Sequence, residues 1–400
     1  MKRLRTQVGI VGAGPAGLLL GHLLHLRGID SIILEDRSRE YVIGRVRAGV
    51  LEQGTVDLLV SVGLGERLQR QGMRHGAIQL CFRRRRHRID FDKLTPGRSI
   101  TVYGQNELVT DLIAARQATD RPLYFSVRDV RVADFDSAPR IAFQTEQDDS
   151  EIRCDFIAGC DGGHGVCRPS ILAAHDGAMR VYERQYPFAW LGILADAAPS
   201  CEELVYALHE RGFALFSMRS PSITRLYVQC APDENIENWP DERIWHELAA
   251  RFETADAWGP NRGAILQKGI SGMHSLVVEP MRCGRLFLAG DAAHIVPPTG
   301  AKGLNLAVAD VCVLARALAA YYREGRKDLL DRYSDQCLRR VWAVQRFSFW
   351  MTSMLHIAPD GSEFDYRRQL AELDYVTTSR AAMTCLAENY TGLPLEMQSP

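Results

Sequence analysis

The sequence lacks an excess of charge of either sign and a long uninterrupted apolar run. Its 400 residues contain 48 lysines and arginines against 49 aspartates and glutamates. A dedicated nucleic-acid-binding chain normally shows a clear basic excess, so this balance argues against that class. No segment beyond the N-terminal region approaches ~18 uninterrupted apolar residues, so we expect no membrane span. With 46% hydrophobic residues, the composition is that of a folded protein of two or three domains.

The sequence also has no closely paired cysteines, and we expect no leader peptide. Ten cysteines are scattered along the chain without any CxxC pair. This spacing is typical of free thiols in a reducing compartment, rather than of a disulfide framework or a zinc site. The basic N-terminus with apolar residues 8–26 is similar to a signal peptide, but glycines and histidines interrupt it and no small-residue cleavage site follows. We therefore expect a cytoplasmic protein without a bound metal.

The N-terminal segment contains a nucleotide-binding pattern. A β-rich run at 7–11 precedes a turn with Gly12, Gly14 and Gly17, and a helical run follows. Gly12 permits the tight turn, Gly14 lets backbone amides approach a pyrophosphate, and Gly17 lets the helix pack closely on the sheet. The next apolar run ends in Glu35, whose carboxylate can accept hydrogen bonds from a ribose diol. The pattern predicts dinucleotide binding without separating FAD from NAD(P).

The most basic segment is 83–88, where five arginines surround one histidine. One interpretation is a strip that binds nucleic acid or phosphate. We favour a solvated hairpin in which 89–91 return as a strand, because no aromatic residues interleave with the arginines.

A second nucleotide signature lies near residue 290. A buried strand at 286–289 delivers Gly290 and Asp291 at its carboxyl end, where ligands bind in open α/β sheets. A loop rich in proline and glycine follows, and a helix is predicted from Leu304. The first amides of that helix can serve an anionic ring or phosphate. Residues 99–230 are mostly strand-like, and 304–388 are mostly helical with an aromatic stripe typical of a core or a subunit interface.

Three signatures in this order resemble the flavoprotein aromatic hydroxylases. They are GAGPAG at 12–17 with Glu35, CDG at 160–162, and GDAAHIVPPTGAKGLN at 290–305. The resemblance continues at 44–53, 102–105, 211–215 and 387–390, and it covers essentially the whole chain. Within this family, the sequence most resembles the members that act on 4-hydroxybenzoate.

The resemblance implies an α/β fold, mixed with α+β features, in which an FAD-binding domain with a Rossmann-like βαβ unit is interleaved with a β-sheet substrate domain. The FAD domain would comprise 1–75, 101–182 and 276–305. The substrate domain would comprise a hairpin at 76–100 and a β-rich unit at 183–275. A helical region at 306–400 would form a homodimer interface.

The resemblance also assigns the cofactor site. Glu35 would hold the adenosine ribose, and Asp291 would bind the ribityl or pyrophosphate region. Backbone amides of Leu304 and Asn305 would lie near the flavin pyrimidine edge, where such donors stabilise an anionic reduced flavin. The full implied set is Gly12, Gly14, Ala16, Gly17, Glu35, Arg45, Val46, Arg47, Ala48, Gly49, Val50, Gln105, Asp291, Leu304 and Asn305.

The substrate residues follow a chemical logic. A benzoate carboxylate suits a planar bidentate donor, and Arg219 has hydroxyl groups nearby. By resemblance, Tyr206 would contact the phenol oxygen, Tyr390 would be the next hydroxyl of a proton relay, and His75 would titrate near neutral pH and pass the proton outward. The substrate-binding set is Tyr206, Ser217, Met218, Arg219, Tyr227 and Pro298, with Tyr206, Tyr390 and His75 as the catalytic set.

The implied reaction uses NADH or NADPH and O2 to hydroxylate 4-hydroxybenzoate to 3,4-dihydroxybenzoate through a flavin hydroperoxide. Asp36 would repel a 2′-phosphate and favour NADH, whereas Arg37 would favour NADPH, so we expect relaxed coenzyme choice tilted toward NADH. His164 and Arg168 match residues that contact the coenzyme pyrophosphate, and Arg225 matches one that governs flavin movement.

Two other functions stay open at this stage. The same chemistry on another hydroxy- or aminobenzoate is one, because a pocket discriminates modestly between small groups. The other is a non-catalytic binding protein built on the FAD fold, as GDP-dissociation inhibitors are. The presence of Gly300, Asn305 and Tyr390 argues against that second function.

Overall fold

A six-stranded sheet carries the first glycine-rich motif in this computed structural model, which describes residues 1–45, 49–174, 177 and 179–394. All of its strands are parallel except the edge strand β19. The strand order is β19 (Arg282–Cys283), β20 (Leu286–Leu288), β13 (Phe156–Gly159), β2 (Val8–Val11), β3 (Ser31–Leu34) and β9 (Leu123–Tyr124). The central strands are buried along their length, as expected for a parallel sheet covered on both faces. This sheet confirms the strands predicted around the nucleotide signatures.

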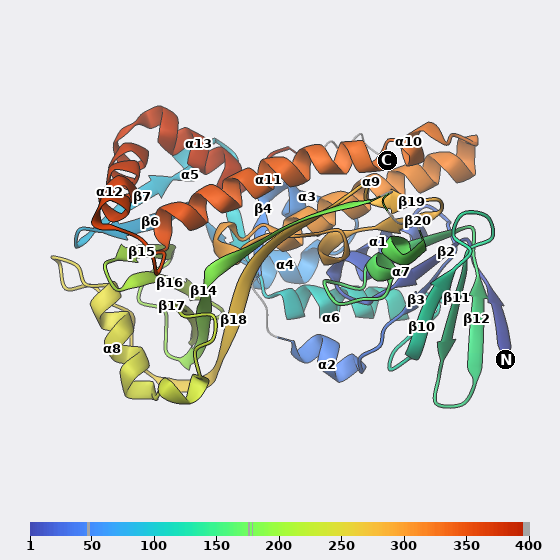
Figure 1. Cartoon of the computed structure of the whole chain (residues 1–400), viewed down its shortest axis with the longest axis horizontal. Coiled ribbons are helices and arrows are strands. Elements are labelled where there is room, and N and C mark those ends of the chain that lie inside the picture. Colours follow the sequence, from blue (N-terminus) through green and yellow to red (C-terminus); the bar gives the residue numbers. More distant parts are fainter. Residues whose placement is uncertain (46–48, 175–176, 178, 395–400) are drawn as a thin grey trace.

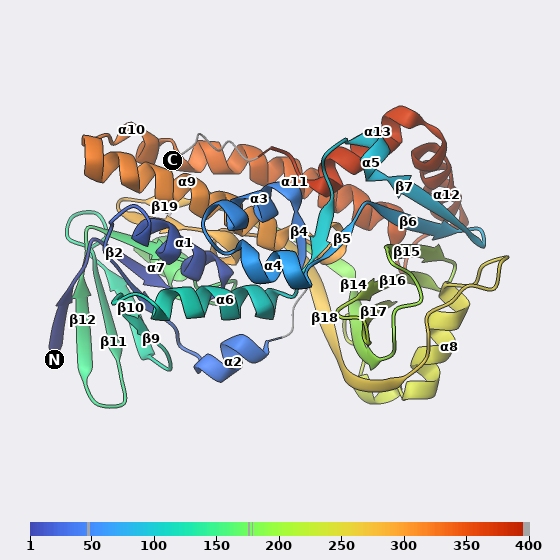
Figure 2. The same cartoon turned by 180° about the vertical axis from the view of Figure 1, so that it is seen from behind.

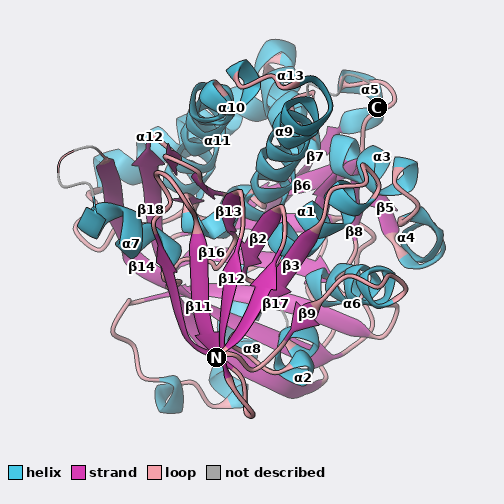
Figure 3. Ribbon diagram, turned by 90° about the vertical axis from the view of Figure 1, so that its right-hand side faces the viewer, coloured by secondary structure: helices cyan, strands magenta, loops and turns pink. Residues whose placement is uncertain are grey.

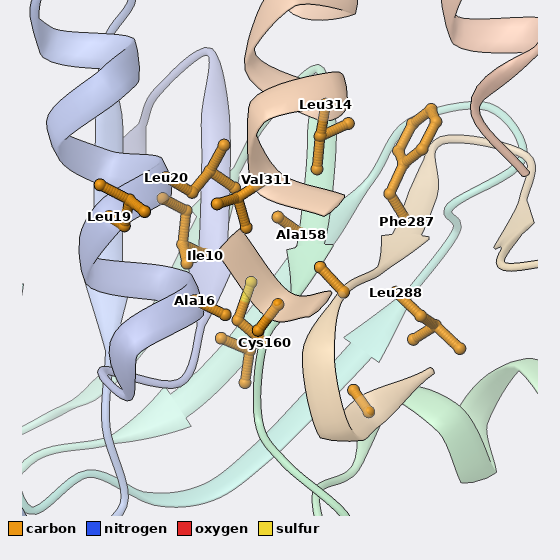
Figure 4. Packing of buried hydrophobic residues seen from close by; sticks show 14 of the residues in the cluster. Ile10, Ala16, Leu19, Leu20, Ala158, Cys160, Phe287, Leu288, Val311 and Leu314 are labelled. Carbon is orange, nitrogen blue, oxygen red and sulfur yellow. The ribbon is translucent and has the colours of Figure 1, made fainter. Parts of the chain in front are cut away.

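Helices and a second sheet cover its two faces (Figure 3). On one face lie α1 (Pro15–His25) and α9 (Gly303–Glu324), which contact each other. Figure 4 shows Leu19 and Leu20 of α1 and Val311 of α9 packed with Ile10 of the sheet. On the other face lies a four-stranded sheet of β1 (Lys2–Arg5), β12 (Asp149–Arg153), β11 (Arg140–Gln144) and β10 (Arg128–Ala133). Both glycine-rich turns therefore lie at the carboxyl ends of strands in the parallel sheet, the first after β2 and the second after β20.

An eight-stranded sheet forms the other half of the molecule (Figure 1). Its order is β21 (His294–Ile295), β18 (Ala264–Glu279), β14 (Arg180–Asp196), β17 (Ile223–Cys230), β16 (Gly212–Met218), β15 (Leu204–His209), β6 (Ala77–Phe82) and β7 (Arg85–Asp90). The long strands β14 and β18 run from one half into the other (Figure 2). The packed helices are α8 (Asp241–Arg251), α11 (Tyr333–Leu355), α12 (Glu363–Thr378) and α13 (Arg380–Thr391).

A small three-stranded sheet and several further helices complete the fold. The sheet contains β4 (Val50–Glu52), β8 (Ile100–Val102) and β5 (Met73–His75). The short elements are α2 (Arg39–Gly44), α3 (Gln53–Ser61), α4 (Gly65–Gln71), α5 (Phe91–Leu94), α6 (Gln105–Gln117), α7 (Cys167–Ala174), α10 (Asp328–Asp331), and the single turns η1 (Ile236–Asn238), η2 (Gly290–Ala292) and η3 (Pro298–Gly300).

The arginine-rich segment is the hairpin that the sequence favoured. Strands β6 and β7 pair through a two-residue turn at Arg83 and Arg84, whose φ angles of 49° and 60° lie in the left-handed region. Arg83 forms an ion pair with Asp374 at 2.7 Å, and Arg84 forms one with Glu253 at 2.9 Å. These side chains therefore connect the hairpin to α12 and to the segment that follows α8.

One described helix, α9, is long and apolar enough to be a membrane-span candidate by composition alone. Most of its apolar window, 72%, is buried inside the fold against the parallel sheet and α1. All ten cysteines lie in the described part of the chain and are free thiols.

Candidate active site

At the first glycine-rich turn, the N-terminal end of helix α1 faces open space. A Cβ on Gly12 would lie 2.3 Å from the Cys160 carbonyl oxygen, and one on Gly17 would lie 1.9 Å from the Gly12 carbonyl oxygen. A Cβ on Gly14 would meet nothing within 4 Å. Gly14 is also the N-cap of α1, and no side chain there caps the helix amides. Gly12 and Gly17 are thus required by packing, whereas Gly14 leaves room for an anionic group at the positive end of α1.

Glu35 closes the same turn. Its Oε2 accepts a hydrogen bond from the Ala13 amide at 2.7 Å, and its Oε1 accepts one from the Arg37 amide at 3.0 Å. Burial, together with the neighbouring Asp36, raises the pKa of Glu35 to about 7. Each carboxylate oxygen keeps a lone pair that a ribose diol can occupy. The turn therefore fits the adenosine half of FAD. Ala16 is buried in the first turn of α1.

A second uncapped helix end lies at α9. The Leu306 amide donates to the Lys302 carbonyl at 2.9 Å, and no side chain caps this end of the helix. The amides of Leu304 and Asn305 come before it, in the first turn, where backbone amides have no acceptor within the helix. This position suits donors to an anionic flavin edge. The Asn305 side chain has another task, because its Nδ2 donates to the Val50 carbonyl at 3.0 Å and its Oδ1 accepts from the Glu52 amide at 2.9 Å. That side chain joins α9 to β4.

The remaining cofactor predictions lie around β4 and α6. Arg45 is exposed at the C-terminal end of α2. A Cβ on Gly49 would lie 2.0 Å from the Tyr103 carbonyl oxygen, so β4 and β8 approach closely there. Gln105 begins α6 directly after Gly104. The predictions for Val46, Arg47 and Ala48 fall outside the described residues.

Tyr206 and Tyr390 meet where the eight-stranded sheet contacts α13. Their hydroxyl groups share a hydrogen bond, and both side chains are buried. Burial raises the pKa of both phenols above the ordinary value. Both groups are therefore neutral at pH 7, which suits a relay in which each hydroxyl accepts one proton and donates another.

His75 lies at the end of β5 with a buried ring. Its Nδ1 has no hydrogen-bond partner among the described residues. Burial lowers its pKa to about 4, although Glu203 raises it in part. The sequence predicted a histidine that titrates near neutral pH, and the structure differs because the ring is only 2% exposed. In this conformation His75 is neutral.

The strand register places two of the other predicted substrate residues, Ser217 and Tyr227, on the same face of the eight-stranded sheet as Tyr206. Tyr206 pairs with Leu215, which pairs with Tyr227, and Ser217 pairs with Arg225. Directly paired residues share a face, as do residues two apart in a strand. Ser217 and Tyr227 therefore lie on the face of Tyr206, and Arg219 follows Ser217 by two.

The Arg219 guanidinium is held at the end of β16. Its side chain hydrogen-bonds Tyr227, and burial lowers its pKa against the effect of that tyrosine. The Ser217 hydroxyl donates to the Arg225 carbonyl at 3.1 Å, and the Arg225 guanidinium lies 5.1 Å from the centre of the Tyr227 ring. Met218 is buried beside them, and Pro298 begins η3.

The predicted coenzyme residues fall into two groups. Asp36 and Arg37 are exposed and lie 3.5 Å apart, and His164 is also exposed. Arg168 is instead half-buried, and its guanidinium donates to the carbonyls of Asp291 and Ala292 at 3.3 Å and to that of Gly163. Arg168 therefore connects the loop that contains Gly163 to the turn that contains Asp291 and Ala292.

A buried charged cluster behind Tyr390 escaped the sequence analysis. Lys302 Nζ donates to Glu52 Oε1 at 2.7 Å and to the Tyr390 carbonyl at 2.9 Å. Arg340 lies 3.4 Å from the other oxygen of Glu52. Burial lowers the pKa of Lys302, and the pair with Glu52 opposes that shift. A lysine inside a glycine-rich loop was the available signal, but its burial depends on contacts distant in sequence.

Comparisons with known proteins agree with this geometry. The family model described as FAD binding domain matches residues 5–348. The chain is 47% identical to the p-hydroxybenzoate hydroxylase of Acinetobacter baylyi, over 100% of this chain and 98% of that one. It is 27% identical to a 3-(3-hydroxy-phenyl)propionate/3-hydroxycinnamic acid hydroxylase of Mycobacterium sp., over 82% of this chain and 56% of that one.

Solved structures show the same fold. A p-nitrophenol 4-monooxygenase from Pseudomonas putida superposes with a TM-score of 0.84 at 19% identity, covering 98% of this chain and 99% of that one. An aklavinone-11 hydroxylase, solved with FAD and aklavinone, superposes with a TM-score of 0.72 at 23% identity, covering 91% of this chain and 71% of that one.

Proposed function

The chain belongs to the FAD-binding family of flavoprotein aromatic hydroxylases, and from this membership we propose that it hydroxylates 4-hydroxybenzoate beside the phenol oxygen, giving 3,4-dihydroxybenzoate. FAD is the cofactor, NADH or NADPH is the electron donor, and O2 is the second substrate. The 47% identity to a p-hydroxybenzoate hydroxylase over the whole chain supports this substrate.

The observation that carries the proposal is the common face of Tyr206, Ser217 and Tyr227, with Arg219 next in line. Tyr206 and Tyr227 lie two strand spacings apart, roughly 10 Å, with Leu215 between them, so an aromatic ring lying over Leu215 would have a polar group at each end. Arg219 offers a bidentate donor for a carboxylate. Tyr206 offers a buried hydroxyl for a phenol.

Each side chain then has a defined task. Arg219 orients the ring by its carboxylate, and Tyr206 accepts the phenol proton while donating its own to Tyr390. The ring is left as an electron-rich phenolate, and reduced FAD bound at this site would supply the electrons that activate O2 for transfer to the ring. His75 takes up the departing proton only where its ring gains contact with water, because burial holds its pKa at about 4.

A ligand panel tests this assignment. We expect FAD-loaded protein to bind 4-hydroxybenzoate at least ~30-fold more tightly than 4-hydroxybenzamide, since breaking one partner of a buried charged pair costs roughly 2–5 kcal/mol. Arg219→Ala should remove the preference, and Arg180→Ala, an exposed change on β14, should keep it. Equal affinity for acid and amide in the native protein would contradict the carboxylate site.

A second candidate substrate is a 4-aminobenzoate or a dihydroxybenzoate, which the same face can hold. Steady-state NAD(P)H oxidation with H2O2 measured alongside separates the candidates. The true substrate gives product with little peroxide. A non-catalytic role is disfavoured by the buried Tyr206–Tyr390 pair, since a binding protein has no need of a proton relay.

The coenzyme preference is proposed to be relaxed and tilted toward NADH. Asp36 is exposed and directly follows Glu35 at the end of β3, and its negative charge would repel a 2′-phosphate. Arg37 partly balances that charge at 3.5 Å. A strict preference for NADPH in kcat/KM would contradict this proposal, and Asp36→Asn should raise the NADPH value relative to NADH.

We also place the protein in the cytoplasm as a homodimer. Its ten free thiols support a reducing compartment. Exposed aromatic residues on α11 and β14 support self-association.

A further inference from the structure

Asp310 lies behind the Gly290–Asp291 turn and not at the front of the site. It sits in the second turn of α9, with a side chain only 2% exposed. Its Oδ2 accepts a hydrogen bond from the Gly290 amide at 2.9 Å and lies 2.6 Å from His294 Nε2. The Cys337 thiol of α11 also hydrogen-bonds this carboxylate. One buried carboxylate therefore joins η2, β21 and α11.

Gly290 is the point where both open helix ends meet. Its φ of +64° lies in the left-handed region, so the turn is strained for any residue with a side chain. A Cβ there would lie 3.1 Å from the Ala307 Cβ of α9 and 3.5 Å from the Ala16 Cβ of α1. A small displacement of Gly290 therefore changes how Asp291 sits relative to the start of both helices.

The other backbone groups of the turn are also held. The Gly290 carbonyl accepts from the Ala293 amide at 2.8 Å, and the Asp291 and Ala292 carbonyls accept from Arg168 at 3.3 Å. The Gly290 amide is held by the Asp310 carboxylate alone among the described residues. Asp310 is thus the contact through which α9 fixes the turn.

We propose that Asp310 is a positioning residue for the cofactor, which sets the Gly290–Asp291 turn by holding the Gly290 amide and keeps its own charge balanced by His294. The inference rests on the proposed FAD site. Asp310 does not touch the cofactor in this account, and it acts through Gly290 and Asp291.

The ion pair explains why an acid can occupy this place beside an anionic cofactor. Burial by itself lowers the pKa of His294, but Asp310 and Asp291 more than offset it, so the pKa is raised above the usual value. A protonated His294 cancels the charge of Asp310. The pair thus holds the turn without adding a net negative charge near the pyrophosphate.

Three variants separate positioning from general stability. Asp310→Leu keeps the number and branching of the side-chain heavy atoms and removes the acceptor, whereas Asp310→Asn keeps an acceptor for the Gly290 amide. Tyr333→Phe is the control for lost stability, because it removes another buried hydrogen bond, from the Tyr333 hydroxyl to the Leu288 carbonyl at 2.7 Å, and leaves the contact between Asp310 and the Gly290 amide in place. Tyr333 also hydrogen-bonds Cys337, so the control includes the loss of that neighbouring contact. The FAD dissociation constant, the Tm of the apoprotein and the visible circular dichroism of bound flavin are measured for each.

We expect Asp310→Leu to weaken FAD binding at least tenfold more than Tyr333→Phe does at a comparable loss of apoprotein Tm, and to change the flavin dichroism. Asp310→Asn should recover most of the affinity. Equal weakening by Asp310→Leu and Tyr333→Phe would overturn the proposal, because both would then act through stability.

If Asp310→Leu does not fold, hydrogen exchange on the native apoprotein tests the proposal instead. The Gly290 amide should exchange as slowly as the amides of β20, and exchange as fast as an exposed loop would overturn the proposal. A native protein that binds no FAD would instead contradict the proposed function.

Discussion

Tyr206 and Tyr390 share a buried hydrogen bond between a strand and a helix, and burial keeps both phenols protonated at neutral pH. Tyr206→Phe removes the first hydroxyl of the relay and leaves Arg219 to bind the acid. We expect 4-hydroxybenzoate to bind, but product formed per NAD(P)H oxidised to fall at least tenfold, since positioned proton transfer contributes roughly 10²–10⁴-fold to a rate. Tyr375→Phe, an exposed change on α12, is the control. Tight coupling in Tyr206→Phe would refute the relay.

Glu35 makes FAD binding depend on pH. Its pKa of about 7 in the apoprotein means that the carboxyl is largely protonated at pH 6 and ionised at pH 8. Ribose hydroxyls donate to the ionised form and lower that pKa, so binding at pH 6 should release a proton and affinity should rise from pH 5 to pH 7. Calorimetry in two buffers of different ionisation enthalpy counts the protons. Release that persists in Glu35→Gln would exclude Glu35 as the source.

Residue chemistry was partly predictable from the sequence. The glycines and Glu35 follow a local pattern and lie where it predicts. Lys302 and Asp310 were missed, because the burial of a charge is decided by distant segments such as β4 and α11. The low pKa of His75 has the same cause, since a side chain's solvent contact is not written in its neighbours along the chain.

At the level of elements, the turn before α1 separates ligand binding from packing. Gly14→Ala keeps an ordinary φ of −73° and meets no atom, so the apoprotein should lose about 1 kcal/mol or less from the weaker N-cap, while FAD affinity falls. Gly17→Ala should unfold the unit, because its Cβ would lie 1.9 Å from a carbonyl oxygen. Thermal melts and FAD titrations of both variants test this. A Gly14→Ala protein that binds FAD normally would contradict the proposal that an anionic group of FAD lies against Gly14 at the start of α1.

Elements with a local signature were predicted one by one, whereas strands fixed by distant pairing were predicted only as part of a strand-rich region. The strands at β2, β3 and β20 are short apolar runs bounded by turn residues. The 17 residues of β14 begin with an exposed polar half, and only their pairing with β18 makes them a strand. Long-range pairing of this kind leaves little pattern in the sequence.

For the whole molecule, an exposed aromatic surface supports the proposed homodimer. Tyr182 of β14 and Trp342 of α11 pack edge to face, with ring centres 5.6 Å apart. Phe349 lies two turns further along α11, and the Arg184 guanidinium lies 4.9 Å from the centre of its ring. Each of the three aromatic side chains is more than two-fifths exposed. We expect light scattering to give twice the mass of one chain. Phe349→Lys, which adds a charge beside Arg184, should give a monomer, and Phe364→Lys on α12 should not. A native monomer would contradict the dimer.

The two halves of the molecule bring a cofactor fold and a substrate face together, and the central claim is that they hydroxylate 4-hydroxybenzoate. The most direct test is to give purified FAD-loaded protein 4-hydroxybenzoate, O2 and NADH or NADPH, and to quantify 3,4-dihydroxybenzoate against coenzyme consumed. This account predicts close to one product per coenzyme with little H2O2. Coenzyme oxidation that yields peroxide without 3,4-dihydroxybenzoate would contradict it.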